Sequence, residues 1–239
     1  MTISLLVPTL NEEAGMRQIM PRIRPGWVDQ ILVVDGGSTD GTQAYARERG
    51  YELLVQKRPG MRHAYIEALD RLTGDVVITF SPDGNSIPEL IPALIEKMRS
   101  GHDMVIVSRY AAGAKSQDDD AVTAFGNWLF TALINLLYGS RYTDSFVMFR
   151  AWRKDVFRRL DLDRDESYRR EERLFGTVVG VEPLLSIRAA KARLRCADIP
   201  GDEPPRYGGE RKLQVLRWGA AYLFEVFREL AVWRAPGAR

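Results

Sequence analysis

The segment that most constrains the fold is residues 31–42, where a short apolar run ends in an aspartate and a glycine-rich turn. Its first four residues, Ile-Leu-Val-Val, are mostly β-branched, which is typical of a strand buried on both faces of a parallel sheet. Asp35 follows the strand at once, and after the turn Asp40 could cap a helix. Open α/β sheets bind nucleotides at the carboxyl ends of their strands. The segment therefore predicts a doubly wound sheet with a nucleotide or sugar on this turn.

Strand-like apolar runs alternate with helical segments along most of the chain. Besides residues 31–34, strands are expected at residues 3–7, 52–56, 75–80 and 104–107, and an edge strand at 195–199. This β-α-β-α-β order predicts a mostly parallel sheet with helices on both faces. Residues 161–173 carry many charges of both signs and are expected to be exposed and mobile.

The composition fits one globular domain. The 239 residues, 45% of them hydrophobic, suffice for one buried α/β domain and are too few for two full ones. A formal net charge of +2 gives no general attraction to nucleic acid, which we exclude as a partner. The single cysteine, Cys196, excludes an intramolecular disulfide and suits the cytoplasm. We expect no signal peptide before residue 3, and no run of about 18 apolar residues predicts a membrane span.

Two further polar segments follow predicted strands. Asn11 and Glu12 come directly after the first strand, where Asn11 could cap a helix or face a ligand. Asp83 and Asn85 follow the strand that ends at Phe80 and are separated by a glycine. Their oxygens suit Mg²⁺ or Mn²⁺, and the same residue types also serve a plain turn.

Two charged loops are open to more than one interpretation. In residues 57–62, Arg58 and Arg62 could approach a phosphate, or the loop is simply solvated. Residues 118–120 are three consecutive aspartates, which could bind a metal but are more typical of a solvated loop.

Two apolar helices are expected beyond residue 120. Residues 124–138 are too few to span a bilayer and too apolar for an ordinary surface, so this helix is buried or lies against a membrane or partner. Residues 213–233 are aromatic-rich and include Arg217 and Arg228, as in an amphipathic helix at a membrane interface or in a homodimer contact. We therefore divide the chain into a domain of residues 1–212 and a C-terminal amphipathic helix and tail of residues 213–239.

Together these motifs resemble family 2 glycosyltransferases of the GT-A fold, over residues 2–215. The motifs appear in the family's order: Pro8-Thr9-Leu10-Asn11-Glu12, Val34-Asp35-Gly36-Gly37-Ser38-Thr39-Asp40-Gly41-Thr42, Asp83 with Asn85, Ser108-Arg109-Tyr110, Asp144 with Phe149-Arg150, and Arg206 to Lys212. Within the family the chain is most similar to the dolichol-phosphate mannosyltransferase group, which uses nucleotide sugars and polyprenyl-phosphate acceptors.

The resemblance implies a role for each matching residue. The donor nucleotide sugar, GDP-mannose or a UDP-sugar, would be bound by Pro8, Asn11, Glu12, Asp35, Arg58, Gly60 and Asp83. A divalent Mg²⁺ or Mn²⁺ cofactor would be held by Asp83, Asn85 and Glu182. Asp83, Asp144 and Glu182 would be the catalytic residues. The acceptor or phosphate groups would be bound by Arg109, Lys115, Arg206 and Lys212.

Several positions depart from the family pattern. Ser81 stands where the metal motif usually opens with an aspartate, which predicts weaker metal binding with Asn85 and Glu182 compensating. Gly36 replaces a frequent second aspartate, and Met148 a frequent glycine. The acidic residues 118–120 lie where the group tends to carry a further arginine, which leaves Arg109 and Lys115 as the cations nearby.

Three functions remain open on the sequence. The first is an inverting glycosyltransferase that acts on a polyprenyl phosphate, peripheral on the cytoplasmic face of a membrane. The second is a soluble glycosyltransferase that acts on a hydroxyl, for which Asp144 or Glu182 would have to accept the proton. The third is a nucleotide-sugar-binding protein with little catalysis, which Ser81 would allow.

Overall fold

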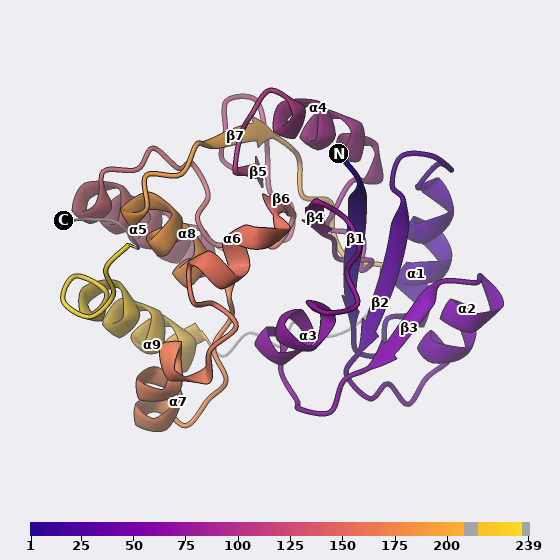
Figure 1. Cartoon of the computed structure of the whole chain (residues 1–239), viewed down its shortest axis with the longest axis horizontal. Helices are drawn as coiled ribbons and strands as arrows, with labels where there is room; N and C mark the ends of the chain where they lie inside the picture. The colour runs from indigo at the N-terminus through magenta and orange to yellow at the C-terminus, as the bar shows by residue number, and fades with distance from the viewer. Residues whose placement is uncertain (208–214, 236–239) are drawn as a thin grey trace.

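The computed structural model describes residues 1–207 and 215–235 and contains a seven-stranded sheet with helices on both sides (Figure 1). The strand order is β3-β2-β1-β4-β6-β5-β7, and only β6 runs antiparallel to its neighbours. The predicted mostly parallel α/β sheet is therefore confirmed. The strands are β1 (Ile3–Thr9), β2 (Gln30–Asp35), β3 (Glu52–Val55), β4 (Val76–Thr79), β5 (Met104–Ser108), β6 (Arg150–Arg153) and β7 (Cys196–Pro200).

Helices cover both faces of the sheet, as predicted. On one face, Met16 of α1, Tyr45 of α2 and Leu94 of α4 belong to one buried apolar cluster. On the other face, a second cluster includes residues from α3, α6 and α8, and α5 and α9 pack against α8 and each other. The helices are α1 (Glu13–Ile19), α2 (Thr42–Glu48), α3 (Met61–Ala68), α4 (Ile91–Arg99), α5 (Ala121–Tyr138), α6 (Lys154–Arg159), α7 (Arg169–Phe175), α8 (Glu182–Lys191) and α9 (Val215–Arg228).

Two sequence predictions about the second half of the chain are wrong. The strands expected from the sequence do not include β6, whose sequence Arg-Ala-Trp-Arg shows no apolar run; yet Arg150, Ala151 and Trp152 are all buried there. The guanidinium of Arg150 is satisfied by hydrogen bonds to Ser186 and to the carbonyls of Ser145 and Val147. Residues 161–173 are not a mobile exposed segment, since they include a 3₁₀ turn and most of α7 and contain the buried Tyr168 and Glu171.

The parallel strands set the position of the candidate site. Because β1, β2, β4 and β5 point the same way, the loops that follow them lie at one edge of the sheet. These loops carry Asn11, Asp35, Asp83 and Arg109. The topology thus brings together four motifs that are up to a hundred residues apart in the sequence.

Helix α5 is longer than predicted and has a polar inner face. It begins at Ala121 rather than residue 124, and within the described residues it is the one helix long and apolar enough to cross a membrane. Asn127 and Thr131 are nevertheless the buried polar residues on its inner face. Its outer face exposes large apolar side chains, namely Val122, Phe125, Trp128 and Leu136.

Replacing Asp120 by alanine is expected to lower the free energy of unfolding by about 1 kcal/mol. Asp120 is the N-cap of α5, where its carboxylate accepts from the backbone N–H of Thr123 at 2.8 Å in a capping box. The control Asp120→Asn removes the charge but keeps the acceptor, so its stability should stay close to wild type. Urea unfolding followed by circular dichroism measures both, and wild-type stability in Asp120→Ala would show that the cap contributes nothing.

Helix α9 has charged residues inside and aromatic residues outside. Glu225 is fully buried, and Arg228 pairs with Glu171 of α7 at 2.7 Å and with Glu229 at 2.7 Å. Glu229 also pairs with Arg188 of α8 at 3.1 Å. The outer face instead exposes Leu223, Phe224 and Phe227. Ala221, Tyr222 and Val226 are also buried, so α9 carries apolar residues on its inner face as well as on its outer face. An amphipathic C-terminal helix stays a prediction.

Thermal stability is expected to fall as the pH rises from about 4.5, and Glu225→Gln should flatten the fall. Burial raises the pKa of the Glu225 carboxyl well above its ordinary value of 4.5, with Glu171 adding to the effect. Above pH 4.5 the unfolded chain loses this proton first, so the free energy of unfolding declines until the folded pKa is passed. Differential scanning calorimetry from pH 4.5 to 8 measures the two proteins, and parallel curves would contradict the assignment.

Candidate active site

Asp35 holds the turn after β2 in shape. Its buried carboxylate accepts hydrogen bonds from the backbone N–H groups of Gly37 and Ser38 at 3.0 and 2.9 Å, and from the Gln43 amide at 2.7 Å. The hydroxyls of Ser38 and Thr9 donate to its other oxygen. These bonds explain why an aspartate must stand at the end of this strand. Its contact with a base or ribose stays a prediction.

The loop after β1 is fastened to this turn. Asn11 has a left-handed backbone, with φ of 58°, and its side-chain oxygen accepts from the backbone N–H of Thr39 at 2.8 Å. The prediction that Asn11 caps a helix is therefore wrong, because Glu12 is the N-cap residue of α1 and no side chain caps it. The backbone N–H of Glu12 donates to Thr42 at 2.9 Å, and Pro8 is buried in β1 opposite Val34.

Asp40 also links the two loops. Its carboxylate accepts from the N–H of Thr42, the first residue of α2, at 2.9 Å and from the N–H of Glu13 at 3.2 Å. The N-cap position itself is Gly41, so Asp40 supports the start of α2 from one residue earlier than predicted.

A second cluster lies at the end of β4 and combines Asp83 and Asn85 with Arg206. Asp83 is 5% exposed, and its carboxylate accepts from the backbone N–H of Asn85 at 3.0 Å. Nη1 of Arg206 lies 3.4 Å from the Asp83 carboxylate. Burial opposes the charge of Arg206, but Asp83, Asp118 and Glu12 raise the pKa of its guanidinium above the ordinary value. The structure thus brings together three predicted site residues, Glu12, Asp83 and Arg206.

This cluster has the chemistry of a cation site. The side-chain oxygen of Asn85 is buried and accepts no hydrogen bond, although such an oxygen normally has a partner. Asn85 and Asp83 are joined by the backbone N–H of Asn85, and their side chains carry hard oxygens of the kind that Mg²⁺ and Mn²⁺ prefer. The residues therefore fit a divalent cation. Within the described residues no three His, Cys, Asp or Glu side chains gather as a metal set.

The acidic residues 118–120 are not a plain solvated loop, so that interpretation is wrong. Asp118 accepts from Asn85 and from Arg206, both at 3.1 Å. Asp119 lies 3.6 Å from Arg109 and accepts from the hydroxyl of Tyr110. Asp120 caps α5. Three identical neighbours in the sequence therefore contact the cluster at Asp83, the cluster at Arg109 and the start of a helix.

Arg109 and Asp144 form a nearly buried pair at the end of β5. Nε of Arg109 lies 2.6 Å from the Asp144 carboxylate, and its Nη1 lies 3.2 Å from Glu203. Asp144 is fully buried and also accepts from the Asn127 amide of α5 at 3.2 Å and from the backbone N–H groups of Phe146 and Val147. Burial would raise the pKa of the Asp144 carboxyl, but Arg109 and these donors hold it below its ordinary value of 3.8.

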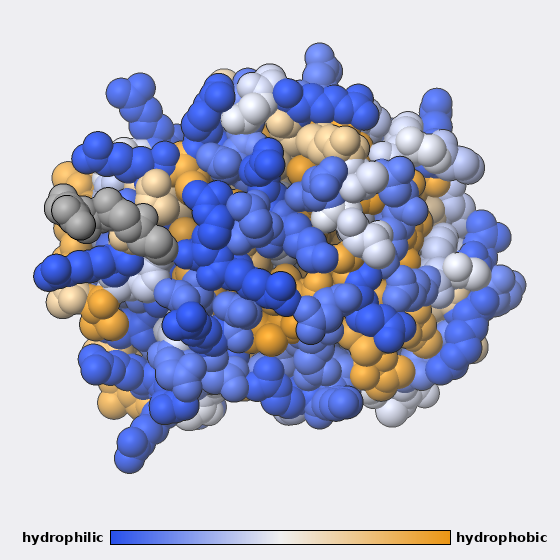
Figure 2. All heavy atoms as spheres, viewed as in Figure 1, coloured by the Kyte–Doolittle hydropathy of each residue, from blue (hydrophilic) through white to orange (hydrophobic). Residues whose placement is uncertain are grey.

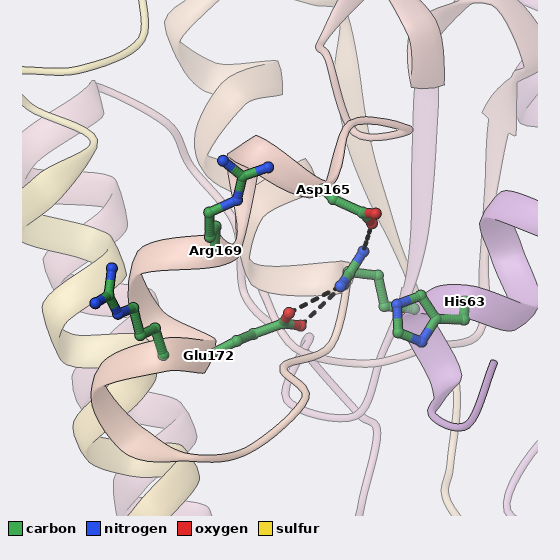
Figure 3. A pocket seen from close by; sticks show the side chains of 6 residues that line it. His63, Asp165, Arg169 and Glu172 are labelled. Carbon is green, nitrogen blue, oxygen red and sulfur yellow. Dashed lines mark hydrogen bonds and ion pairs between the residues drawn. The ribbon is translucent and has the colours of Figure 1, made fainter.

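Arg58 and Gly60 lie in the loop between β3 and α3. Arg58 pairs with Asp165 at 2.8 Å, and Gly60 has φ of 104° as the N-cap residue of α3. Next to them is a cavity of about 410 Å³ between α3 and α7 (Figure 3). In it the buried Arg62 is paired with Asp165 and Glu172, and Arg62 also lies over the ring of Tyr168. Both arginines of this loop therefore hold α7 and its preceding turn in this structure.

The remaining predicted residues are less closely grouped. Glu182 begins α8 and accepts from the hydroxyl of Tyr65 at 2.6 Å, on the face covered by α3 and α8. Lys115 is exposed, and its backbone joins the loop to Asp202 and Glu203. Lys212 lies outside the described residues. The roles of Glu182, Lys115 and Lys212 stay predictions.

Sequence reasoning missed two acids of this site, Asp119 and Glu203. Both pair with Arg109, and Glu203 is 8% exposed. Glu203 follows Gly201 and Asp202 in a loop whose composition gives no sign of burial. Its contact arises because Glu203 bridges to Ser116, which brings the loop after β7 alongside the loop after β5.

Two relatives that are named as sugar transferases match nearly the whole chain, and a third matches about half of it. The chain is 29% identical to the undecaprenyl-phosphate mannosyltransferase of Micrococcus luteus, over 95% of this chain and 98% of the relative. It is 25% identical to the glycosyltransferase AglJ of Haloferax volcanii, over 95% of this chain and 71% of the relative. Over 49% of this chain it is 33% identical to 36% of the dolichol-phosphate mannosyltransferase of Pyrococcus furiosus.

Solved structures share the fold. Glucosyl-3-phosphoglycerate synthase from Mycobacterium tuberculosis, in complex with Mn²⁺, uridine diphosphate and phosphoglyceric acid, superposes with a TM-score of 0.65 over 98% of this chain and 80% of that one, at 22% identity. This likeness confirms the GT-A fold. The model for the family described as glycosyl transferase family 2 matches residues 4–161. With the strand-end motifs in the order and the fold that this family has, the chain belongs to glycosyl transferase family 2.

Proposed function

We propose that this protein transfers a sugar, with inversion, from a nucleotide sugar to a polyprenyl phosphate at a membrane surface. The observation that carries the proposal is the position of α5. On its inner face the side-chain amide of Asn127 donates a hydrogen bond to Asp144 in the site. Its outer face exposes Phe125 and Trp128. A lipid-linked acceptor needs its phosphate in the site and its hydrocarbon chain in an apolar phase. The inner face of α5 would lie at the phosphate, and its outer face would contact the apolar phase.

The donor would occupy the strand-end edge between the turn after β2 and the cluster at Asp83. Asp83 and Asn85 would hold Mg²⁺ or Mn²⁺, which supplies a Lewis acid for the charge that develops on the leaving nucleoside diphosphate. Arg206, already 3.4 Å from Asp83, would add positive charge to the diphosphate. Asn11 and Glu12 keep the two nucleotide-side loops in register.

The state of Asp144 favours an acceptor that is already anionic. A general base must take up a proton, and a carboxylate with a lowered pKa that accepts from Arg109, Asn127 and two backbone N–H groups is poorly suited to this. A phosphate is ionised at pH 7 and needs no base. Asp144 would then act mainly by holding Arg109 in place.

Arg109 would bind the acceptor phosphate after exchanging a partner. It now faces Asp144, Glu203 and Asp119, so among the described residues Arg109 has three acidic partners. Burial raises the pKa of the Glu203 carboxyl above 4.5, so Glu203 is the partner that gives up its charge at least cost. A phosphate that approaches Nη1 of Arg109 would take the place of Glu203 there.

The membrane contact would be made by α5 and α9 together. These helices pack against each other, and Figure 2 shows apolar side chains emerging at the edge of the molecule where they lie. Their exposed large apolar residues are Val122, Phe125, Trp128, Leu136, Leu223, Phe224 and Phe227. Exposed aromatic residues on a face with arginine nearby, as at Arg217, are typical of helices that lie in a membrane interface.

Trp128→Glu and Phe227→Glu are each expected to reduce partitioning onto liposomes about tenfold or more, because an aromatic side chain contributes about 1.5–3 kcal/mol when buried. The control Val55→Glu also replaces an exposed apolar residue by glutamate, in β3 at the other edge of the sheet. It should bind liposomes as wild type does. Flotation with vesicles of phosphatidylglycerol and phosphatidylcholine measures all three. Dimers that dissociate in Phe227→Glu, without vesicle binding by wild type, would instead assign this face to a second subunit.

The proposed reaction is tested by nucleoside diphosphate release. Purified protein with Mn²⁺, detergent and a panel of GDP- and UDP-sugars should release the diphosphate when undecaprenyl phosphate is added, and not when undecaprenol is added. Release that depends instead on a soluble sugar or alcohol would reject the polyprenyl phosphate. The absence of release with every acceptor, despite binding of a nucleotide sugar, would favour a binding protein.

A further inference from the structure

The donor-side cluster contains a carboxylate that does not come from the β4 loop. Asp118 belongs to the loop after β5, thirty-three residues beyond Asn85, yet its Oδ2 accepts from the Asn85 amide at 3.1 Å. The same oxygen accepts from Nε of Arg206 at 3.1 Å. The Asp118 side chain is 19% exposed, so most of it is buried against its neighbours.

The β4 loop itself is short of one acid. Ser81 and Asp83 are separated by one residue, and a serine hydroxyl carries no charge for a divalent cation. Asn85 adds a neutral oxygen that is buried and accepts no hydrogen bond. One carboxylate and one amide leave such a site with half the charge of its ion, and Asp118 stands where a second charge is needed.

Arg206 occupies the space between the two carboxylates. Its guanidinium reaches Asp83 at 3.4 Å and Asp118 at 3.1 Å, so one cationic group forms an ion pair with both acids at once. The loop that carries it is tied to the same place, because the backbone N–H of Tyr207 donates to the carbonyl of Asp83 at 2.8 Å. A positive group held between two converging carboxylates marks the place that a metal cation would take.

We propose that Asp118 supplies the second carboxylate of the donor-side cation site, in compensation for Ser81, and that Arg206 fills this site until the metal and the diphosphate arrive. The inference rests on the proposed cation at Asp83. It makes Asp118 a metal-binding residue contributed by a different loop, and it gives Arg206 two positions: on the carboxylates in the free protein and on the diphosphate in the complex.

The test is Mn²⁺ binding to the nucleotide-free protein, measured by the electron paramagnetic resonance signal of free Mn²⁺. Arg206→Gln should bind Mn²⁺ more tightly than wild type, because it removes the competing cation. Asp118→Asn should weaken binding about tenfold or more, both alone and in the Arg206→Gln background, by analogy with the loss of metal-site groups elsewhere. Asp120→Asn removes the same charge two residues away while keeping the helix cap, and it should match wild type.

The outcomes separate the inference from the proposed function. If Asp118 only holds Arg206, Asp118→Asn will leave Mn²⁺ affinity unchanged or raise it as Arg206→Gln does, and the inference is wrong while the site at Asp83 stands. If Asp83→Asn binds Mn²⁺ as well as its parent, or if neither wild type nor Arg206→Gln binds it, the cation site and the inference fall together. Thermal melting of each variant confirms that the compared proteins are folded.

Discussion

Asp83→Asn is expected to lower kcat/KM for glycosyl transfer about 100- to 1,000-fold, the range seen when one group that stabilises developing charge is removed. Asp83 is the buried carboxylate at the end of β4 and the one nearest to Arg206 among the predicted donor residues. The asparagine keeps an oxygen to accept from the backbone N–H of Asn85, so the loop should hold its shape. Only the charge that binds the cation is lost.

Initial rates at saturating and subsaturating donor measure this effect. Asp70→Asn is the matched control, since Asp70 lies on the surface with a side chain 86% exposed and pairs only with Arg158 among its charged contacts in the described structure. Wild-type rates in Asp83→Asn with Mn²⁺ present would remove Asp83 from the chemistry. If kcat/KM falls only because the donor KM rises while kcat is unchanged, Asp83 is a binding residue without a specific role in the transition state.

Arg109→Lys is expected to raise the acceptor KM about 10- to 100-fold, because hydrogen bonds to charged groups contribute about 1.5–3 kcal/mol and lysine cannot form the two-pronged contact of arginine. The donor KM should change less than threefold by comparison, since Arg109 lies at the end of β5 and its guanidinium donates to Asp144 and Glu203 rather than to the predicted donor residues in the described part of the chain. Bisubstrate kinetics with a short-chain polyprenyl phosphate measure both constants.

Arg109→Ala separates the role in binding from the role in stability. Removing the guanidinium leaves the fully buried Asp144 without its ion-pair partner, which is expected to cost about 3–5 kcal/mol of unfolding free energy. Guanidinium chloride unfolding measures the loss. Equal rises in the donor and acceptor KM in Arg109→Lys, with stability unchanged in Arg109→Ala, would place Arg109 outside the acceptor site.

The part of the fold set by local apolar patterns was predictable from the sequence. β1, β2, β4 and β5 consist mainly of aliphatic residues because they are largely buried on both faces of the sheet. Their polar ends then had to meet at one edge, which was enough to predict a site with Asp35 and Asp83. β6 could not be found this way, because two of its four residues are arginines. Arg150 is buried there, and its guanidinium donates to Ser186 of α8 and to the carbonyl of Ser145 in the preceding loop.

The contacts between loops were not predictable, because they depend on tertiary structure. Nothing local distinguishes Asp118, Asp119 and Asp120, yet each has a different partner set by the fold. The same holds for Glu225, a charged residue that would be placed on the outside of α9 by its type and is fully buried. Its burial follows from the packing of α9 on the domain, which only the folded structure shows.

The central claim is that a polyprenyl phosphate receives the sugar, and product analysis tests it most directly. Wild-type protein is incubated with each nucleotide sugar, Mn²⁺ and undecaprenyl phosphate in detergent, and the lipid phase is analysed by mass spectrometry. The account predicts a lipid heavier by one glycosyl residue with at least one donor, formed on the phosphate and absent when undecaprenol replaces it. A lipid phase without glycosylated product for every donor, while a soluble hydroxyl acceptor is glycosylated, would contradict it.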